Sequence, residues 1–198
     1  MNTLKAEKRS MDVKAKRLRR EGFVTGNLFG REIEGSIPLK FTKKEIEALL
    51  KNNNKGSQVM LELDGKTYDA LIKEVDYNPL AHTVEEVDFQ ALVSNEMVHS
   101  VAEIILENEE KVVSGVLQDE LKEVAYKAFP ADLVDKIKVD VSGMKIGDTL
   151  RVKDLEIAQN KNIHITTDLE AVIATVTPVH NVVPETETET EETAAEEK

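Results

Sequence analysis

The alternation of apolar and polar residues predicts short strands in the first half of the chain. Apolar and polar positions alternate from Ile33 to Phe41, as in a strand with one buried face, and Pro38 favours a place near a sheet edge. Two further runs, residues 59–63 and 67–75, flank Asp64-Gly65, which is a strong signal for a tight hairpin turn. The pattern therefore predicts one strand followed by a hairpin.

One clear helical pattern interrupts these strands. Thr42 and Glu45 have the spacing of a capping box, in which each side chain bonds a backbone N–H at the start of the helix. Ile46, Leu49 and Leu50 then form one apolar face. We expect a short helix that packs this face against the strands.

The first half closes with a turn and a last strand. The turn falls at Asn78-Pro79, and the strand is expected over residues 83–92. About five short strands, one helix and tight turns predict a small closed or nearly closed β-barrel. The polar residues 94–96 mark the expected boundary between a domain of residues 1–93 and one of residues 94–184.

The second half is also predicted to be mostly β. Strands are expected over residues 98–106, 137–141, 149–152 and 171–176. Gly115 precedes an amphipathic segment in which Leu117, Leu121 and Val124 share roughly one face, and Phe129-Pro130 ends that segment. The whole chain is therefore expected to be mainly β with few helices, as two domains in sequence.

The closing segment, residues 185–198, alternates Glu with Thr and contains no large apolar residue. Such a segment cannot bury enough surface to offset its chain entropy, so we expect a disordered acidic tail. A solubilising role is the default interpretation. The alternative is an electrostatic mimic that competes for basic surfaces.

Charge is distributed unevenly along the chain. The net charge is −12, yet residues 1–30 hold eight Lys and Arg against three Asp and Glu, a net charge of +5. The only strongly basic stretch is Arg9 to Gly30. A cationic segment on a chain that otherwise repels polyanions predicts a specific anionic partner.

A short helix is expected within this basic stretch. Asp12 can cap it, Gly22 ends it, and Met11, Ala15 and Leu18 fall at the spacing of a buried stripe. Five cationic side chains are then directed to solvent: Lys14, Lys16, Arg17, Arg19 and Arg20. The alternative interpretation is an ordinary solvated amphipathic helix.

The sequence contains no pattern typical of an enzyme. Zero cysteines exclude disulfides and thiolate chemistry, and the four histidines stand too far apart in sequence for a local metal pair. Gly22, Gly26 and Gly30 lack the Lys-Ser/Thr of a phosphate-binding loop. We expect no catalytic site, cofactor or metal. No apolar run approaches the roughly 20 residues that span a bilayer, so a cytoplasmic protein without membrane contact is expected.

Motifs along the chain resemble one family, the bacterial large-subunit ribosomal protein twenty-five in its two-domain form, also called general stress protein Ctc. The first half contributes Leu4-Lys-Ala-Glu-Lys-Arg9, Lys16-Arg-Leu-Arg-Arg-Glu-Gly22, Leu28-Phe-Gly30, Ala70-Leu-Ile-Lys-Glu-Val75 and Val87-Asp-Phe89. The second half contributes Ser114-Gly-Val-Leu117, Phe129-Pro-Ala-Asp132, Ile137-Lys-Val-Asp-Val-Ser-Gly143 and Met144-Lys-Ile-Gly-Asp148. Their order covers essentially the whole chain except the tail.

The resemblance implies a structural protein of the large ribosomal subunit whose N-terminal barrel binds 5S rRNA. Arg9, Arg19 and Arg20 would then contact phosphates, and Asp88 would accept hydrogen bonds from the RNA or from an orienting Arg. Four further side chains are expected to contribute: Lys14, Lys16, Arg17 and Lys73, with the ring of Phe29 beside them. Neighbouring ribosomal proteins are expected partners of the second domain, and the free protein is expected to be a monomer.

Three positions depart from the usual family pattern. Phe29 replaces a Tyr and has no hydroxyl, while Asp76 replaces a Gln and Glu86 replaces a His. The two new carboxylates would repel RNA phosphates. The alternative hypothesis is therefore a divergent, stress-related paralogue with weak or no rRNA binding, acting as an acidic binding or chaperone-like protein.

Overall fold

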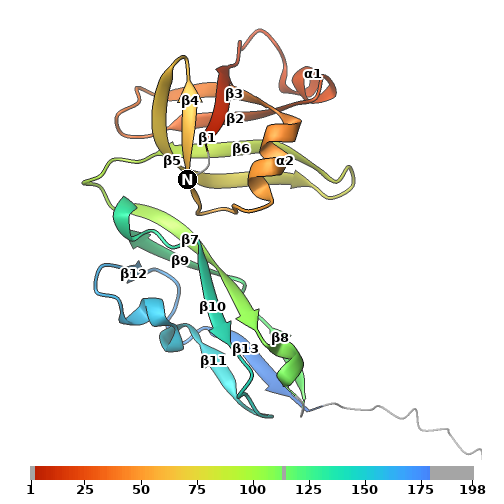
Figure 1. Cartoon of the computed structure of the whole chain (residues 1–198), viewed down its shortest axis with the longest axis vertical. Helices are drawn as coiled ribbons and strands as arrows, with labels where there is room; N and C mark the ends of the chain where they lie inside the picture. Colours follow the sequence, from red (N-terminus) through yellow and green to blue (C-terminus); the bar gives the residue numbers. More distant parts are fainter. Residues whose placement is uncertain (1–2, 113–114, 179–198) are drawn as a thin grey trace, which may run out of the picture.

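The computed structural model describes residues 3–112 and 115–178 and contains a β-barrel followed by two smaller sheets (Figure 1). The mainly β fold with few helices is confirmed. The predicted disordered tail, residues 185–198, lies outside the described residues. The second β-rich part extends away from one end of the barrel, so the described chain is elongated (Figure 1).

Six strands form the closed barrel in the order β1-β3-β2-β6-β5-β4. Their bounds are β1 Thr3–Lys8, β2 Phe23–Phe29, β3 Ser36–Thr42, β4 Gln58–Leu63, β5 Lys66–Asn78 and β6 Thr83–Ala91. Strand β1 pairs in parallel with β4 and closes the barrel, which removes free sheet edges. The predicted hairpin joins β4 to β5, and Asp64 and Gly65 both have positive φ, as its tight turn requires.

The barrel core is packed with apolar side chains from all six strands and from the second helix. The rings of Phe41 and Phe89 lie 5.4 Å apart between centroids and are tilted by 55°. Gly26 in β2 permits the close approach of β6, because a Cβ atom there would lie 2.1 Å from the Val87 carbonyl oxygen. Only glycine therefore fits at this point of the parallel β2–β6 contact.

The second helix was predicted correctly from its capping pattern. Helix α2 spans Lys43–Leu50, and the Thr42 hydroxyl accepts a hydrogen bond from the Glu45 backbone N–H. Ile46 and Leu49 are buried against the barrel, as expected from their spacing. The apolar face of the helix therefore packs against the barrel and joins its core.

The first helix begins later than predicted. Helix α1 spans Ala15–Arg20, and Asp12 bonds the Ser10 hydroxyl in a preceding turn instead of capping the helix. Met11 therefore lies outside the helix and is 73% exposed, so its assignment to the buried stripe was wrong. Leu18 is buried, as predicted, and holds α1 against the barrel.

The second part of the chain consists of two packed sheets. A four-stranded sheet has the order β10-β7-β9-β12, and a three-stranded sheet has the order β11-β13-β8. Their strands are β7 Val98–Glu107, β8 Val116–Asp119, β9 Glu123–Ala128, β10 Lys136–Asp140, β11 Thr149–Arg151, β12 His164–Ile165 and β13 Val172–Thr177. The amphipathic segment after Gly115 thus forms two strands, β8 and β9, and it places side chains on a core shared by both sheets.

Single turns of 3-10 helix complete the second part. They are η1 Glu109–Lys111, η2 Pro130–Asp132, η3 Val152–Asp154 and η4 Glu156–Gln159. Tyr126 of β9 is fully buried in this part, and its hydroxyl donates to Val134 O and accepts from Val134 N, both at 2.7 Å. This double hydrogen bond holds the loop after η2 against the sheet.

The loop between α2 and β4 makes hydrogen bonds that hold the second part against the barrel. Asn54 Nδ2 donates to Glu103, Ser57 Oγ donates to Asp135 at 3.2 Å, and Ser100 Oγ donates to Gly56 O. Gly56 has a φ of +90°, and a Cβ atom there would lie 1.9 Å from Val101 O. The backbones of the two parts therefore touch at a position where only glycine fits.

Candidate nucleic-acid interface

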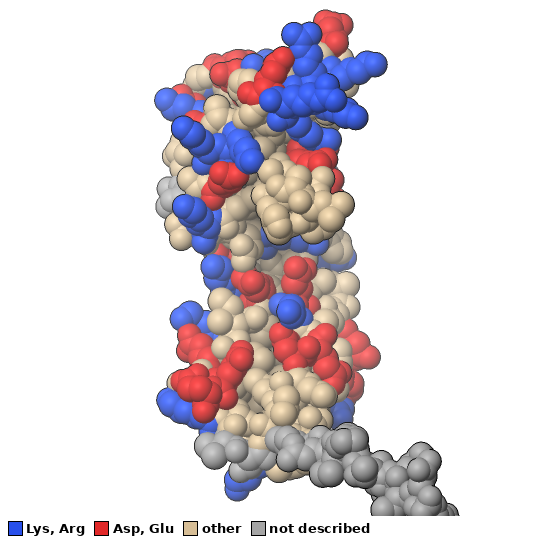
Figure 2. All heavy atoms as spheres, turned by 90° about the vertical axis from the view of Figure 1, so that its right-hand side faces the viewer, with Lys and Arg blue, Asp and Glu red and all other residues tan. Residues whose placement is uncertain are grey.

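Helix α1 concentrates exposed cations on one side of the barrel. Its outward positions carry Lys16, Arg17 and Arg20, and Lys14 is its N-cap residue. Figure 2 shows Lys and Arg side chains gathered at the upper end of the face that carries α1. Arg17 is partly neutralised by Glu21 at 2.9 Å, an exposed pair of small net strength. The helix presents a cationic surface on a chain with a net charge of −12.

Arg9 follows β1 and is bound to the loop that leads into α1. Its Nη2 donates to Val13 O at 3.1 Å, and its backbone N–H donates to Pro38 O of β3. Its Nε atom is buried and has no hydrogen-bond partner within the described residues. Arg9 therefore supports the start of α1 as well as carrying charge.

Arg19 faces the barrel instead of solvent, with 30% of its side chain exposed. Its Nε donates to Glu85 O at 3.1 Å, Nη1 lies 3.0 Å from a Glu85 carboxylate oxygen, and Nη2 lies 3.3 Å from Glu86. Each guanidinium nitrogen thus has a partner inside the protein. The prediction that Arg19 is directed to solvent with the other cations was wrong, because β6 supplies two carboxylates beneath α1.

Asn27 and Asp88 form a second polar contact on the outer face of β2 and β6. Asp88 Oδ1 accepts from the Asn27 backbone N–H at 3.0 Å and from its Nδ2 at 3.1 Å. The same amide nitrogen donates to Glu86 Oε1 at 3.3 Å. Asp88 is therefore oriented by Asn27, not by an arginine.

The two carboxylates that depart from the family pattern lie opposite one another. Asp76 of β5 pairs in register with Glu86 of β6, and Glu74 pairs with Asp88. These four acids line an open depression of about 280 Å³ on the barrel surface. Like charges on directly opposed strand positions repel one another and any phosphate brought near them.

Phe29 and Lys73 occupy different surroundings. Phe29 ends β2 in register with Gln90 of β6, on the same side of the strand as Asn27. Lys73 lies at an irregularity in the β5–β6 register, between Ile72 and Glu74, and its Nζ donates to His99 O of β7 at 2.8 Å. The structure therefore brings Phe29 to the face of Asp88 but places Lys73 at the junction with the second part.

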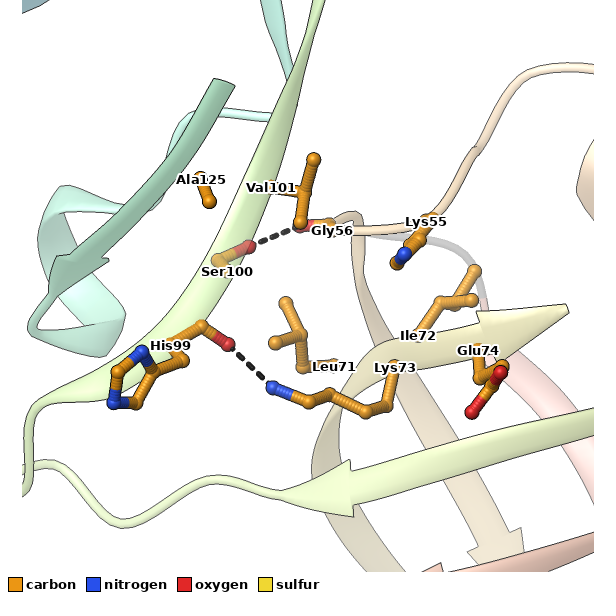
Figure 3. A pocket seen from close by; sticks show the side chains of 10 residues that line it. All are labelled: Lys55, Gly56, Leu71, Ile72, Lys73, Glu74, His99, Ser100, Val101 and Ala125. Carbon is orange, nitrogen blue, oxygen red and sulfur yellow. Dashed lines mark hydrogen bonds between the residues drawn. The ribbon is translucent and has the colours of Figure 1, made fainter. Parts of the chain in front are cut away.

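Lys73 lines a pocket of about 250 Å³ between the barrel and β7 (Figure 3). Partial burial lowers the pKa of Lys73, and the nearby charge of Lys55 lowers it further. Leu71, Ile72 and Val101 are among the other residues that line the pocket. Gly56, where the barrel contacts the second part, is one wall of this pocket. The Lys73 side chain extends across the pocket from β5 to β7.

Two residues that organise this interface were not identified from the sequence. Glu85 holds Arg19, and Asn27 holds Asp88. Both contacts join positions about sixty residues apart, across the parallel pairing of β2 with β6 and the packing of α1 on it. Only knowledge of that pairing could have indicated them.

Neither a metal-binding site nor a membrane-spanning helix is found in the described part of the chain. Within residues 3–112 and 115–178, no group of three or more His, Asp or Glu side chains is placed to hold a metal ion. No helix in those residues is long and apolar enough to cross a membrane.

The fold and this site define a two-part β protein that presents one cationic surface beside its N-terminal barrel. Residues 4–89 match the model of the Ribosomal L25p family, and residues 97–180 match that of the ribosomal protein TL5 C-terminal domain. The chain belongs to the family of large ribosomal subunit protein bL25. This membership confirms the predicted resemblance and supports the interpretation that the chain is not an enzyme.

Relatives from distant bacteria cover most of the chain. The large ribosomal subunit protein bL25 of Carboxydothermus hydrogenoformans is 34% identical over 86% of this chain and 85% of its own length. That of Akkermansia muciniphila is 31% identical over 87% of both chains. That of Bacillus velezensis is 31% identical over 90% of this chain and 89% of its own. Both parts of the fold are therefore shared with these proteins.

Proposed function

We propose that this protein is a structural component of the large ribosomal subunit and binds 5S rRNA through the barrel face next to α1. The cytoplasm is then its location, and its role is assembly and stabilisation of RNA, not catalysis. The observation that carries the proposal is the group of exposed cations on α1, beside a β2–β6 face that carries an oriented acceptor, Asp88.

The cations of α1 supply attraction, and the strand face supplies recognition. Lys16 and Arg20 are exposed and suited to phosphates, which lie along both edges of the wide, shallow minor groove of A-form RNA. Asp88 Oδ1 is occupied by Asn27, whereas Oδ2 accepts no hydrogen bond within residues 3–112 and 115–178. That oxygen suits a 2′-hydroxyl or a base amino group.

A binding titration with 5S rRNA at several salt concentrations tests this function. Affinity should fall steeply as salt rises, because phosphate contacts release counterions. Charge reversal at Arg20 should weaken binding and flatten the salt dependence. Lys138 is the matched control, since it is exposed, paired with Glu107 at 2.6 Å and located on β10 of the second part. Absence of binding at low salt, or binding indifferent to salt, would reject the function.

The second candidate function is that of an acidic, stress-related binding protein that has lost most RNA affinity. The engagement of Arg19 by Glu85 and Glu86 favours it, since one arginine of the RNA surface is already neutralised. Ribosome co-sedimentation separates the two functions. The second is supported if the protein remains free while Asp76→Gln with Glu86→His moves it onto ribosomes.

The second part of the chain is proposed to contact neighbouring ribosomal proteins, with residues 94–96 retained as the boundary of two domains. The free protein is proposed to be a monomer. Sedimentation of the purified protein tests the oligomeric state, and cross-linking within intact large subunits tests the neighbours. Cross-links that involve only the barrel would contradict the role assigned to the second part.

A further inference from the structure

The hairpin that joins β5 to β6 ends in an exposed, uncharged tip. The tip, residues 77–83, contains no Asp, Glu, Lys or Arg. Leu80 is 94% exposed and Tyr77 is 54% exposed. Figure 1 shows the hairpin extending on the same side of the barrel as α1, and Figure 2 shows an uncharged projection directly below the basic group on that face. The two features are neighbours on that face, with acidic side chains between them (Figure 2).

The tip is held in a defined conformation. Asn78 Oδ1 accepts hydrogen bonds from the backbone N–H groups of Leu80 and Ala81, both at 3.1 Å. The Tyr77 hydroxyl lies 3.2 Å from His82 Nδ1, and Pro79 restricts the backbone between them. Leu80 is therefore presented outward by an ordered turn, so little conformational freedom is lost when it binds a partner.

The tip contributes nothing to the barrel interior. Neither Leu80 nor Tyr77 belongs to the buried core or to the partly buried residues packed against it. A large apolar side chain held almost fully in water gives no stability to the folded chain. Together with the half-exposed Tyr77, it leaves an apolar surface available to another molecule.

One carboxylate connects the tip to the basic helix. Glu85 Oε1 accepts from Asn78 Nδ2 at 2.7 Å, and Glu85 Oε2 lies 3.0 Å from Arg19 Nη1. The position of the tip relative to α1 is thereby fixed through one side chain. A ligand held by the cations of α1 therefore meets Leu80 and Tyr77 in a constant arrangement.

We infer that the hairpin tip binds the uncharged surface of the RNA, with a base or ribose packed against Leu80 and Tyr77. The inference rests on the proposed 5S rRNA function, because α1 supplies the phosphate contacts that bring the RNA to this face. The tip lacks the cations that phosphates require, whereas bases and riboses offer apolar surface to an aliphatic or aromatic side chain. In this arrangement the tip makes the non-ionic contacts with the RNA, and α1 makes the ionic ones.

The salt dependence of binding distinguishes the ionic contacts of α1 from the non-ionic contact of the hairpin tip. Removal of a phosphate contact lowers the slope of log affinity against log salt by about 0.7 to 0.9, whereas removal of an apolar contact leaves the slope unchanged. Tyr77→Ala with Leu80→Ala should weaken 5S rRNA binding by about five- to a hundredfold, the range of one stacked base, at every salt concentration. The slope of the wild type should be retained.

Ile146→Ala with Leu169→Ala is the matched control, because both residues are 48% exposed and lie in the second part. It should bind 5S rRNA like the wild type. Thermal unfolding of both double variants should match the wild type, since no buried contact is removed. Wild-type affinity in the tip variant overturns the inference, and so does a reduced salt slope.

Two outcomes separate this inference from the proposed function. If the wild type fails to bind 5S rRNA, the proposed function is rejected and the tip has no RNA to contact. If the wild type binds and the tip variant binds equally well but no longer enters large subunits, the tip contacts a protein neighbour. That result overturns the inference while it leaves the proposed function intact.

Discussion

Arg19 Nη2 lies 3.3 Å from a carboxylate oxygen of Glu86, so a side chain of α1 contacts β6. The sequence resemblance leads us to expect a histidine at this position, whereas Glu86 supplies an anionic partner for the arginine. The protein thus carries an internal anion at the place where an RNA phosphate would approach Arg19. Under the proposed function, we expect the charge at position 86 to control RNA affinity.

Glu86→Gln should strengthen 5S rRNA binding by roughly tenfold, or about 1.4 kcal/mol. The amide keeps the size of the side chain but removes the charge that holds Arg19 and repels phosphate. Affinity is measured by titration at low salt. Glu123→Gln on β9 is the control and should leave affinity unchanged. An equal or lower affinity for Glu86→Gln would show that Arg19 is not part of the RNA surface.

Asp88→Asn should have the opposite effect. If Asp88 serves only as a further negative charge, its neutralisation would raise RNA affinity. As an acceptor oriented by Asn27, it should lose hydrogen bonds to the RNA, and affinity should fall by about 1 to 3 kcal/mol. The direction of the change, measured beside Glu86→Gln in the same titration, decides between the two roles.

Gly56→Ala should destabilise the protein more than an alanine at a comparable glycine. The new Cβ atom would lie 1.9 Å from Val101 O, so the barrel and the second part must separate. Gly147→Ala is the matched control, because Gly147 has the same φ of +90° but open space around it. We expect a loss of roughly 1 to 2 kcal/mol for Gly147→Ala.

For Gly56→Ala we expect roughly 1 to 3 kcal/mol beyond that value, from steric overlap. Denaturant unfolding followed by circular dichroism measures both variants. Equal losses in the two variants would show that the contact between Gly56 and Val101 adjusts without cost.

Tyr126→Phe should lower the free energy of unfolding by about 1 to 3 kcal/mol, because the N–H and C=O of Val134 lose their partner. Tyr77→Phe is the control, since Tyr77 is exposed. Thermal unfolding near neutral pH measures the difference. Equal stability of both variants would mean that water replaces the lost hydroxyl.

Tyr126 also predicts a loss of stability at alkaline pH. Burial raises the pKa of Tyr126 above its ordinary value, which is about 10. The folded state therefore retains the phenol proton more strongly than the unfolded state. Its contribution is fully present below the unfolded pKa and is lost as the pH rises through the folded one. The stability difference between wild type and Tyr126→Phe should shrink over that range, and a constant difference would contradict this.

The sequence predicted those elements that form because of interactions between neighbouring residues. The Thr42–Glu45 spacing gave α2, and Asp64-Gly65 gave the β4–β5 hairpin, because capping and turn conformation depend on neighbouring residues. The start of α1 was misplaced because the Ser10–Asp12 turn competes for the same polar groups. The segment after Gly115 needed knowledge of its sheet partners, β13 and β7, to be recognised as two strands.

The sequence predicted which residues make up the site but not which of them contact one another. The basic helix and Asp88 were found from charge and family motifs, whereas the pairing of Arg19 with Glu85 and Glu86 depends on the distance at which the fold places α1 from β6. The orientation of Lys73 depends on a register irregularity beside it in β5. Such features arise from strand register, and register is decided by the packing of the whole barrel.

The contact at Gly56 also determines where the far end of the molecule lies. Hydrogen bonds from Asn54, Ser57 and Ser100 surround that contact, so the second part cannot swing freely about the barrel. If the barrel binds RNA as proposed, the far end of the β11-β13-β8 sheet takes a fixed position and orientation relative to that RNA. In that arrangement, the length of the second part sets how far from the RNA the chain extends.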